Sequence, residues 1–459
     1  MSDRVPADYR AYLDRVWEGE ASIAEHMSGV WSKDGLIPVA AGAAIFAHFA
    51  NVTAFDTGDG LVLIDSGEWR TAGELHRQVR AWSDAPVTAV VFTHGHVDHV
   101  FGVGPFDAEA EAAGGHRPEV IAHELVAERF DRYTATAGYN SWINRRQFQL
   151  PALEWPTEYR CPDTVYRDTL TYRRGELTFE LHHARGETDD ATWVWIPELR
   201  ALCTGDLFIW NAPNAGNPQK VQRYPQDWAR ALRAMQDLDP ELLLPGHGVP
   251  IVGADRVRQA LGETAELLET LVEQTLDLMN AGARLDEIVH TVHAPGHLLA
   301  RPYLRPLYDE PEFVVRNLWR QFGGWYDQNP AHLKSAPDAA LAAEVARLAG
   351  GPRALAARAT VLLAEGEDRL AAHLAEWAAQ AAPGDRDVAA VRADVYGRRA
   401  ELERSTMAKG VFTWAACESR AQAAGRDMFE ILAANRTGER DSLGTVIASG
   451  DVRTTGGEA

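Results

Sequence analysis

Residues 90–99 read VVFTHGHVDH, which is an apolar run followed at once by four possible metal ligands. The apolar run is typical of a buried strand, and a loop that leaves a strand end can direct alternate side chains at two neighbouring ions. Imidazole and carboxylate groups are ligands that zinc and related metals accept. The spacing therefore predicts a site for two metal ions that includes His94, His96, Asp98 and His99.

The composition restricts the possible partners and the compartment. Lys and Arg total 45 against 66 Asp and Glu, a formal net charge of −21, which argues against nucleic acid or an anionic membrane surface as a partner. An anionic substrate would need local cations. Cys161, Cys203 and Cys417 show no CxxC spacing, so neither a disulfide framework nor a thiolate zinc site is predicted, and a reducing, cytoplasmic location is favoured.

Residues 35–55 form an uncharged run that could be either a membrane span or part of a sheet. The run contains Pro38, Gly42 and several polar residues, and it is rich in Ala rather than Leu. These features favour two buried strands with a turn at residues 41–42. The N-terminus has no basic segment followed by an apolar core, so we expect no secretory signal.

Short apolar runs separated by turn residues and helical segments fill residues 45–250. We expect residues 172–182 and 191–196 to be a pair of strands. Further strands are expected at residues 61–64, 85–93, 119–123, 201–207 and 242–248. Strand, helix and strand in succession place side chains at the carboxyl ends of the strands. The pattern predicts an α/β fold, an αββα sandwich of two β-rich halves.

Helical patterns dominate the chain after residue 253. A long amphipathic helix is expected at 256–280, followed by helices at 344–350, 354–365, 368–382 and 386–403, with Gly or Pro at the joints. These helices are similar to tetratricopeptide-like hairpins. We therefore predict a catalytic domain over 1–253, an all-α domain over 254–435 and a flexible tail over 436–459.

The HxHxDH motif at 94–99 resembles the signature of the metallo-β-lactamase superfamily. This resemblance implies three further ligands from later turns. Glu187 lies in RGETDD (185–190), where the superfamily usually has His, Asp206 lies in TGD (204–206), and His247 lies in PGHG (245–248). By this resemblance His94, His96 and Glu187 bind the first metal, Asp98, His99 and His247 bind the second, and Asp206 lies between them.

The ligand charges have a consequence for the substrate. Two divalent ions carry +4, whereas Asp98, Glu187 and Asp206 carry −3 and a bridging hydroxide carries −1, so the cluster is neutral. An anion must then be held by side chains beyond the metals. Carboxylate-rich ligation keeps iron or manganese possible beside zinc. A water activated by the metals makes hydrolysis the expected reaction.

Residues 301–333 resemble the dimerisation domain of the alkylsulfatases, most clearly in GGWYDQNPAHL at 323–333, and residues 408–420 are similar to its last helices. The resemblance implies a homodimer that hydrolyses small anionic alkyl sulfate esters, and it supports Glu187, because that branch also uses Glu there. The chain departs from the branch in having Asp206 rather than Glu, in residues 211–224, and in having no sterol-carrier-like domain after the helical one.

The side chains that could hold the sulfate or assist the reaction lie outside the ligand motifs. Lys220, Arg223 and Tyr224 lie in a Pro- and Gly-rich loop after Asp206, and Arg145 with Arg146 form the other basic pair. His183, or His182 beside it, could protonate a leaving group. Two alternatives remain: a hydrolase for a lactone, thioester or phosphoester on the same scaffold, and a binding protein with a vestigial site.

Overall fold

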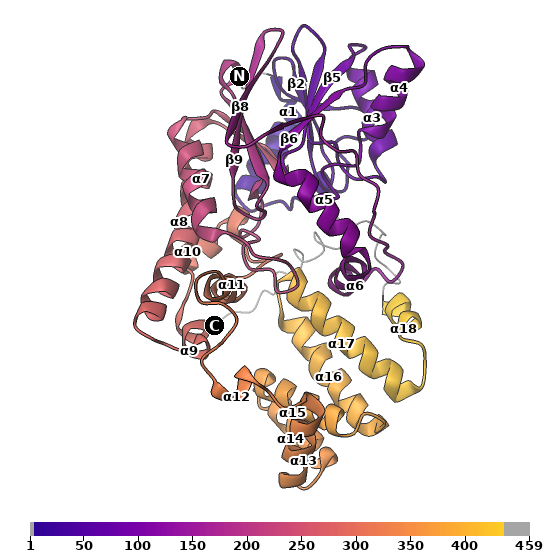
Figure 1. The fold of residues 1–459 in the computed structure, drawn as a ribbon, viewed down its shortest axis with the longest axis vertical. Helices are drawn as coiled ribbons and strands as arrows, with labels where there is room; N and C mark the ends of the chain where they lie inside the picture. The colour runs from indigo at the N-terminus through magenta and orange to yellow at the C-terminus, as the bar shows by residue number, and fades with distance from the viewer. Residues whose placement is uncertain (1–3, 436–459) are drawn as a thin grey trace. The chain divides into compact units, whose positions relative to one another are not determined.

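The computed structural model describes residues 4–435, which form two compact units (Figure 1). The described part of the first unit comprises residues 4–137 and 156–324, and that of the second comprises residues 138–155 and 325–435. The predicted domain boundary after residue 253 stays a prediction. The predicted tail at 436–459 lies outside the described residues.

A seven-stranded sheet in the order β1-β2-β3-β4-β5-β6-β7 forms half of the first unit's core. Neighbours from β1 to β4 pair antiparallel, and neighbours from β4 to β7 pair parallel. The strands are β1 (Ile37–Ala40), β2 (Ala43–Phe46), β3 (Val52–Asp56), β4 (Leu61–Ile64), β5 (Val87–Val91), β6 (Glu119–His123) and β7 (Thr164–Tyr166). The uncharged run at 35–55 thus forms buried strands, as its sequence favours.

A six-stranded sheet in the order β13-β12-β11-β10-β9-β8 forms the other half. Its strands are β8 (Thr169–Arg174), β9 (Leu177–Ala184), β10 (Ala191–Ile196), β11 (Ala201–Ile209), β12 (Leu242–His247) and β13 (Ile251–Val252). The prediction of one strand over 172–182 is wrong, because the chain reverses at Gly175. This residue has φ +52°, and a Cβ on it would lie 1.8 Å from the carbonyl oxygen of Thr57, so the turn requires glycine.

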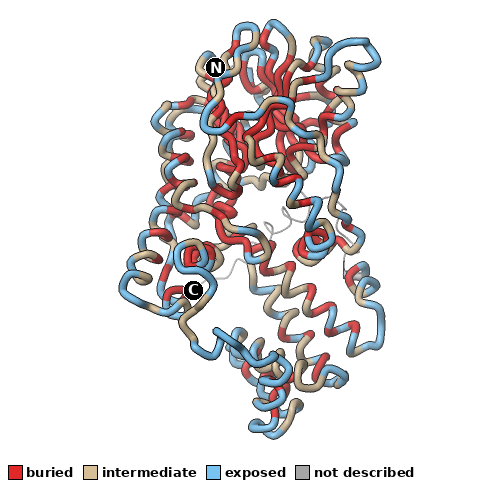
Figure 2. The backbone as a smooth tube through the Cα atoms, in the orientation of Figure 1, coloured by how far each residue is buried: buried red, intermediate tan, exposed pale blue. Residues whose placement is uncertain are grey.

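The two sheets pack face to face, with helices on both outer faces. Along β4, Val62 and Ile64 point into the core shared with the second sheet, whereas Leu61 and Leu63 point towards helices. Both faces are therefore buried, which explains the continuous apolar run. The helices on the first sheet are α3 (Ala72–Trp82), α4 (Gly104–Ala112) and α5 (Leu125–Ala135), and those on the second are α7 (Pro225–Asp237) and α8 (Ala254–Asn280). Figure 2 shows the burial concentrated in the sheets, and the predicted αββα sandwich is confirmed.

Short helices complete the first unit and lead to a longer one, α11. The predicted helix at 256–280 is confirmed as α8, which packs against α11. The remaining elements of this unit are α1 (Ala7–Trp17), α2 (Ala24–Met27), η2 (Pro197–Leu199), α9 (Leu285–Thr291), α10 (Gly296–Leu299), η3 (Pro302–Leu304) and α11 (Pro311–Gly323).

The second unit is all-α, and the four helices predicted over 344–403 are confirmed as α13 to α16. Its helices are α6 (Ala137–Phe148), α12 (Pro330–Leu333), α13 (Asp338–Leu348), α14 (Pro352–Ala364), α15 (Asp368–Ala381), α16 (Arg386–Leu402), α17 (Thr406–Ala424) and α18 (Met428–Asn435). Helix α6 lies against α17, where a Cβ on Gly410 would lie 2.1 Å from the carbonyl oxygen of Gln147. A larger residue at 410 would separate these two helices.

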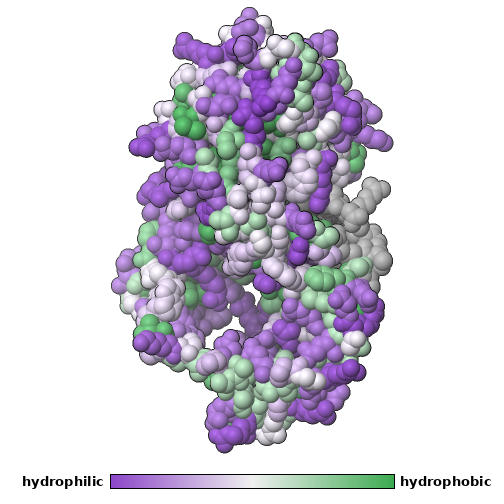
Figure 3. Space-filling model, turned by 45° about the vertical axis from the view of Figure 1, so that its right-hand side comes forward, coloured by the Kyte–Doolittle hydropathy of each residue, from purple (hydrophilic) through white to green (hydrophobic). Residues whose placement is uncertain are grey.

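Within the described residues, none of the helices is both long and apolar enough to cross a membrane. Hydrophilic side chains cover much of the face drawn in Figure 3, and smaller apolar patches lie among them. This distribution fits the high content of acidic residues.

Candidate metal centre

Seven side chains from four separate segments meet at one edge of the sandwich. His94, His96, Asp98 and His99 follow β5, Glu187 lies in the turn between β9 and β10, Asp206 lies in β11, and His247 ends β12. Their ligand atoms form three overlapping groups in which all atoms lie within 4.8 Å of one another: His94–His99–Asp206, Asp98–His99–His247, and His96–Glu187–Asp206. The structure therefore brings together all seven residues that the sequence indicates as ligands.

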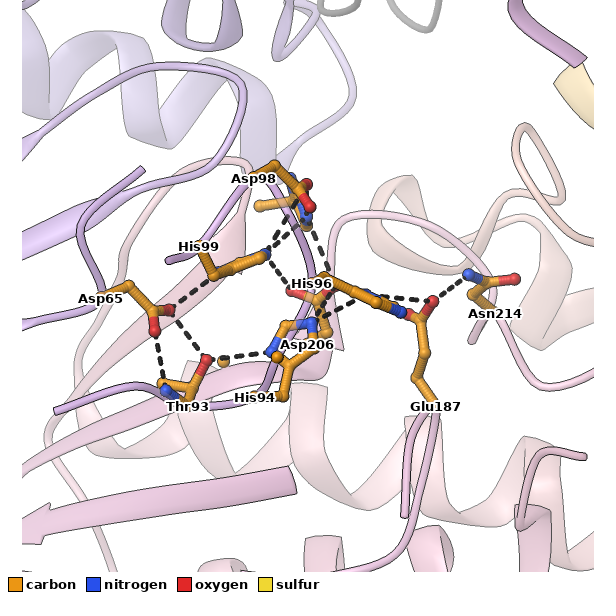
Figure 4. A network of polar contacts seen from close by, with 12 residues as sticks. Asp65, Thr93, His94, His96, Asp98, His99, Glu187, Asp206 and Asn214 are labelled. Carbon is orange, nitrogen blue, oxygen red and sulfur yellow. Dashed lines mark hydrogen bonds and ion pairs between the residues drawn. The ribbon is translucent and has the colours of Figure 1, made fainter. Parts of the chain in front are cut away.

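Hydrogen bonds on the far side of the rings orient His94 and His99 (Figure 4). Asp65 accepts from the Thr93 hydroxyl at 2.8 Å and from His99 Nδ1 at 2.8 Å. Because the Thr93 proton points to Asp65, the Thr93 oxygen accepts from His94 Nδ1 at 3.1 Å. With Nδ1 protonated, a neutral imidazole carries its lone pair on Nε2, so both rings present Nε2 to the cluster.

His247 is oriented in the same way by the main chain. Its Nδ1 donates to the carbonyl oxygen of Phe49 at 2.6 Å, which leaves Nε2 at 3.3 Å from Asp206 Oδ2 and 3.4 Å from Asp98 Oδ2. Nearby Asn51 donates to the carbonyl oxygens of Pro245 and Gly248, so this buried amide holds the turn that carries His247. The Nε2 atoms of His94, His99 and His247 thus all lie near the carboxylate of Asp206.

The charges at the site fit divalent cations. Burial and the neighbouring imidazole of His99 lower the pKa of His94 to about 3. Burial also lowers the pKa of His99, but Asp206, Asp65 and Asp98 outweigh burial and raise it to about 10. A raised pKa means that the carboxylates stabilise a positive charge at this point, which an ion would supply. Asp206 Oδ1 is buried and has no hydrogen-bond partner among the described residues, as expected of a ligand atom.

Glu187 is buried and is held by two side chains from the loop 210–224, which joins β11 to α7. Arg223 Nη1 lies 2.8 Å from Glu187 Oε1 and also donates to the Glu187 carbonyl oxygen. Asn214 Nδ2 donates to the same Oε1, as Figure 4 shows. Burial raises the pKa of Glu187 to about 7, and the guanidinium of Arg223 opposes this rise. Arg223 therefore keeps a buried carboxylate available as a ligand.

The other residues predicted to assist lie in different surroundings. Burial and the neighbouring guanidinium of Arg223 lower the pKa of Lys220 to about 7, whereas the carboxylates of Glu187 and Asp98 oppose this shift, so Lys220 interacts with two of the seven ligand residues. Tyr224 stacks against Arg185, which lies two residues before Glu187: the guanidinium is 4.7 Å from the centre of the Tyr224 ring. His183 stacks on His123 with ring centres 3.7 Å apart, and its Nε2 hydrogen-bonds the Asp189 carbonyl oxygen.

A buried ion pair supports the loop after β5 that carries His94 to His99, and the sequence does not predict this pair. Arg129 of α5 donates from Nε and Nη2 to the two oxygens of Asp190 at 2.7 and 2.9 Å. Asp190 Oδ2 also accepts from the backbone N–H of Gly95 at 3.1 Å. The pair therefore fixes the backbone between His94 and His96. The one feature of the sequence that could have indicated this pair is Asp190 itself, which lies three residues after the predicted ligand Glu187.

Two models of known protein families match parts of the chain. The family model described as the metallo-beta-lactamase superfamily matches residues 45–247, and the model described as alkyl sulfatase dimerisation matches residues 284–422. Residues 45–247 are therefore similar to the metallo-beta-lactamase superfamily, and residues 284–422 are similar to the alkyl sulfatase dimerisation family.

Individual proteins that are similar to this chain include alkylsulfatases. The chain is 27% identical to a linear primary-alkylsulfatase of a Pseudomonas species over 70% of this chain and 63% of that protein. It is 26% identical to an (R)-specific secondary-alkylsulfatase of Pseudomonas, over 81% of this chain and 60% of that one. The solved structure of the sec-alkylsulfatase Pisa1 from Pseudomonas has a TM-score of 0.75 at 22% identity, covering 88% of this chain and 70% of that one. The chain thus spans about 60% of the length of these curated relatives, and the structural likeness shows the fold.

Proposed function

We propose that this chain is a hydrolase that uses two divalent metal ions, most simply zinc, to cleave alkyl sulfate esters. His94, His96 and Glu187 would hold one ion, Asp98, His99 and His247 the other, and Asp206 would contact both. Iron or manganese are alternatives, because three of the seven ligands are carboxylates. The single observation that carries the proposal is the convergence of these seven ligand groups beside the buried cation Arg223.

Ions held in this way would lower the pKa of a bound water and polarise an ester oxygen. The protein's own contribution is orientation. Asp65 and the Phe49 carbonyl fix the ring nitrogens that face the cluster. Asp206, between the histidines of both groups, would fix the separation of the ions.

The loop 210–224 supplies positive charge beyond that of the metal ions and their ligands, which sum to zero when a hydroxide is bound. Two ions and three carboxylates sum to +1, and Arg223 raises the sum to +2 before Lys220 is counted. An anionic ester is therefore attracted to the site even when hydroxide is present. Arg223 Nε and Asn217 Nδ2 are buried donors without a hydrogen-bond partner among the described residues, and a sulfate oxygen would satisfy such donors.

The proposal is tested by metal analysis and a substrate panel. We expect the purified chain to hold close to two equivalents of metal by mass spectrometry and to release inorganic sulfate from a medium-chain alkyl sulfate. Lactones, thioesters and phosphoesters are assayed at the same enzyme concentration. Faster hydrolysis of any of these than of every alkyl sulfate would overturn the substrate assignment, and a metal-free protein that cannot be reloaded would overturn the mechanism.

We also propose that the chain is a homodimer through its helical region, because residues 284–422 match a dimerisation family. Light scattering coupled to size-exclusion chromatography should give twice the mass of 50.5 kDa. A monomer at micromolar concentration would contradict this part of the proposal. The cytoplasmic location stays a prediction.

Replacing Asp65 by Asn should weaken metal binding without removing a ligand. The carboxylate accepts hydrogen bonds from both His99 and Thr93, so an amide at this position disturbs the orientation of His99 and, through Thr93, of His94. Changes to such supporting groups typically cost about 10- to 100-fold in metal affinity. Competition with a chromogenic chelator measures the effect, and Asp59→Asn on the surface should leave the affinity unchanged.

A further inference from the structure

The position of Glu187 depends on a loop that has no helix or strand to stabilise it. Arg223 and Asn214 both contact Glu187 Oε1, and both lie between the end of β11 at Ile209 and the start of α7 at Pro225. An irregular segment of this length loses much conformational entropy when it is ordered. Its side chains can support a ligand only if the loop is itself anchored.

The first anchor is Asp309, which lies just before α11. Its carboxylate is fully buried, and Oδ2 accepts from the backbone N–H of Gly216 at 2.5 Å. Oδ1 accepts from the N–H of Glu310 at 2.8 Å. A Cβ on Gly216 would lie 2.1 Å from the backbone nitrogen of Val314. The loop backbone is therefore in direct contact with the first turn of α11.

The second anchor is Asn317, in the middle of α11. Its Nδ2 donates to the carbonyl oxygen of Arg223 at 3.0 Å, and its Oδ1 accepts from the Arg223 N–H at 3.3 Å and from Gln222 Nε2 at 3.1 Å. The buried amide thus pairs with the backbone of Arg223 as a neighbouring strand would. A buried polar side chain in a helix costs free energy unless such bonds are made, and these bonds are directed at the loop.

We propose that Asp309 and Asn317 are positioning residues for the metal centre. They fix the loop 210–224, and the loop in turn fixes Glu187 through Arg223 and Asn214. This inference rests on the proposed function, because it requires Glu187 to be a metal ligand. The segment before and within α11 lies inside the match to the alkyl sulfatase dimerisation family. The proposal gives this segment a role at the metal centre.

The test measures zinc release from the full-length chain rather than activity. The zinc-loaded wild type and Asn317→Ala are mixed with a chromogenic chelator, and the release of each equivalent is followed with time. We expect one equivalent to leave about 10- to 100-fold faster from Asn317→Ala, as for other supporting groups, and the second to leave at close to the wild-type rate. Only one equivalent is affected because Glu187 belongs to one of the two proposed ligand sets.

The matched control is Thr264→Val on α8. Thr264 is also buried and also bonds a backbone carbonyl, that of Ala260 at 2.7 Å, and α8 packs against α11. This control should lower Tm by a similar amount and release both equivalents at wild-type rates. Two conservative variants, Asn317→Asp and Asp309→Asn, keep part of the hydrogen bonding and should give intermediate release, which retains the test if Asn317→Ala does not fold.

Equal release from wild type and all three variants would overturn the positioning role and leave the proposed function intact. Faster release from Thr264→Val as well would also overturn it, because the effect would then follow stability alone. A wild type that holds no zinc, iron or manganese overturns both proposals. Faster release of a single equivalent, confined to the variants at 309 and 317, supports the inference.

Discussion

Replacing Asp206 by Ala is expected to remove both metal ions and to lower kcat/KM for an alkyl sulfate by on the order of 10³-fold or more. Among residues 4–435, Asp206 is the carboxylate whose ion-pair contacts reach ligands of both proposed ions. Its oxygens lie 3.6 Å from His94 Nε2, 3.4 Å from His99 Nε2 and 3.3 Å from His247 Nε2. Without it, the two ligand sets share no group that holds the ions at a fixed separation.

Metal content and sulfate release should fall together in this variant. The changes Asp98→Ala and His99→Ala should also abolish turnover, although each removes a ligand of only one proposed ion. Asp107→Ala is the matched control, because Asp107 is an acidic residue of α4 that pairs with Arg160 away from the cluster, and it should keep both ions. If Asp206→Ala turns over alkyl sulfate at the wild-type rate, the assignment of the site is wrong.

Replacing Arg129 by Met should lower the free energy of unfolding by about 3–5 kcal/mol, the usual cost of removing one partner of a buried ion pair. The Arg129 and Asp190 side chains are almost fully buried, and both oxygens of Asp190 accept from the guanidinium. Met fills a similar volume but leaves the carboxylate unpaired. Urea denaturation of the metal-free protein at pH 7 measures the change.

The pH dependence gives an independent check on this pair. Burial raises the pKa of Asp190, but Arg129 outweighs burial and lowers it to about 2, below its ordinary value of 3.8. The stabilisation is therefore complete above about pH 4 and is lost as the pH falls towards 2, where the folded state must also take up the proton. The deficit of Arg129→Met should shrink over this range.

Two comparisons separate the buried pair from a general effect of charge. Arg160→Met breaks a partly exposed pair with Asp163 and should cost less than about 1 kcal/mol. Adding Asp190→Asn to Arg129→Met removes the unpaired charge and should recover part of the loss. A deficit below 1 kcal/mol in Arg129→Met alone would contradict the structural role of the pair.

The ligand cluster could be predicted because its information is local. Metal ligands have few possible residue types, and each of the three later ligands follows a glycine in a short motif that resembles one of the superfamily. Supporting residues carry no such signal. Asp65 follows a strand like many aspartates, and only the structure shows that it reaches both Thr93 and His99. The sequence places Arg223 near the site, but its pairing with Glu187 depends on how a long loop folds back.

The strands of the two sheets were predictable for a similar reason, but the prediction was wrong at one turn. Strands buried on both faces give continuous apolar runs, as in β4 and β5. The hairpin at Gly175 was missed because a single glycine between polar residues is a weak turn signal, and its necessity comes from Thr57, far away in the chain. In the same way, nothing local indicates that residues 138–155 pack with the helices near the end of the chain.

That last arrangement constrains the order of events during synthesis. Helix α6 leaves the ribosome early, yet Gln149 at its end bonds the carbonyl of Gly410, 261 residues later. Until α17 has been made, α6 lacks the helix that its last turn contacts at Gly410. The nascent chain therefore carries a helix without its packing partner through most of translation, a state that favours chaperone binding.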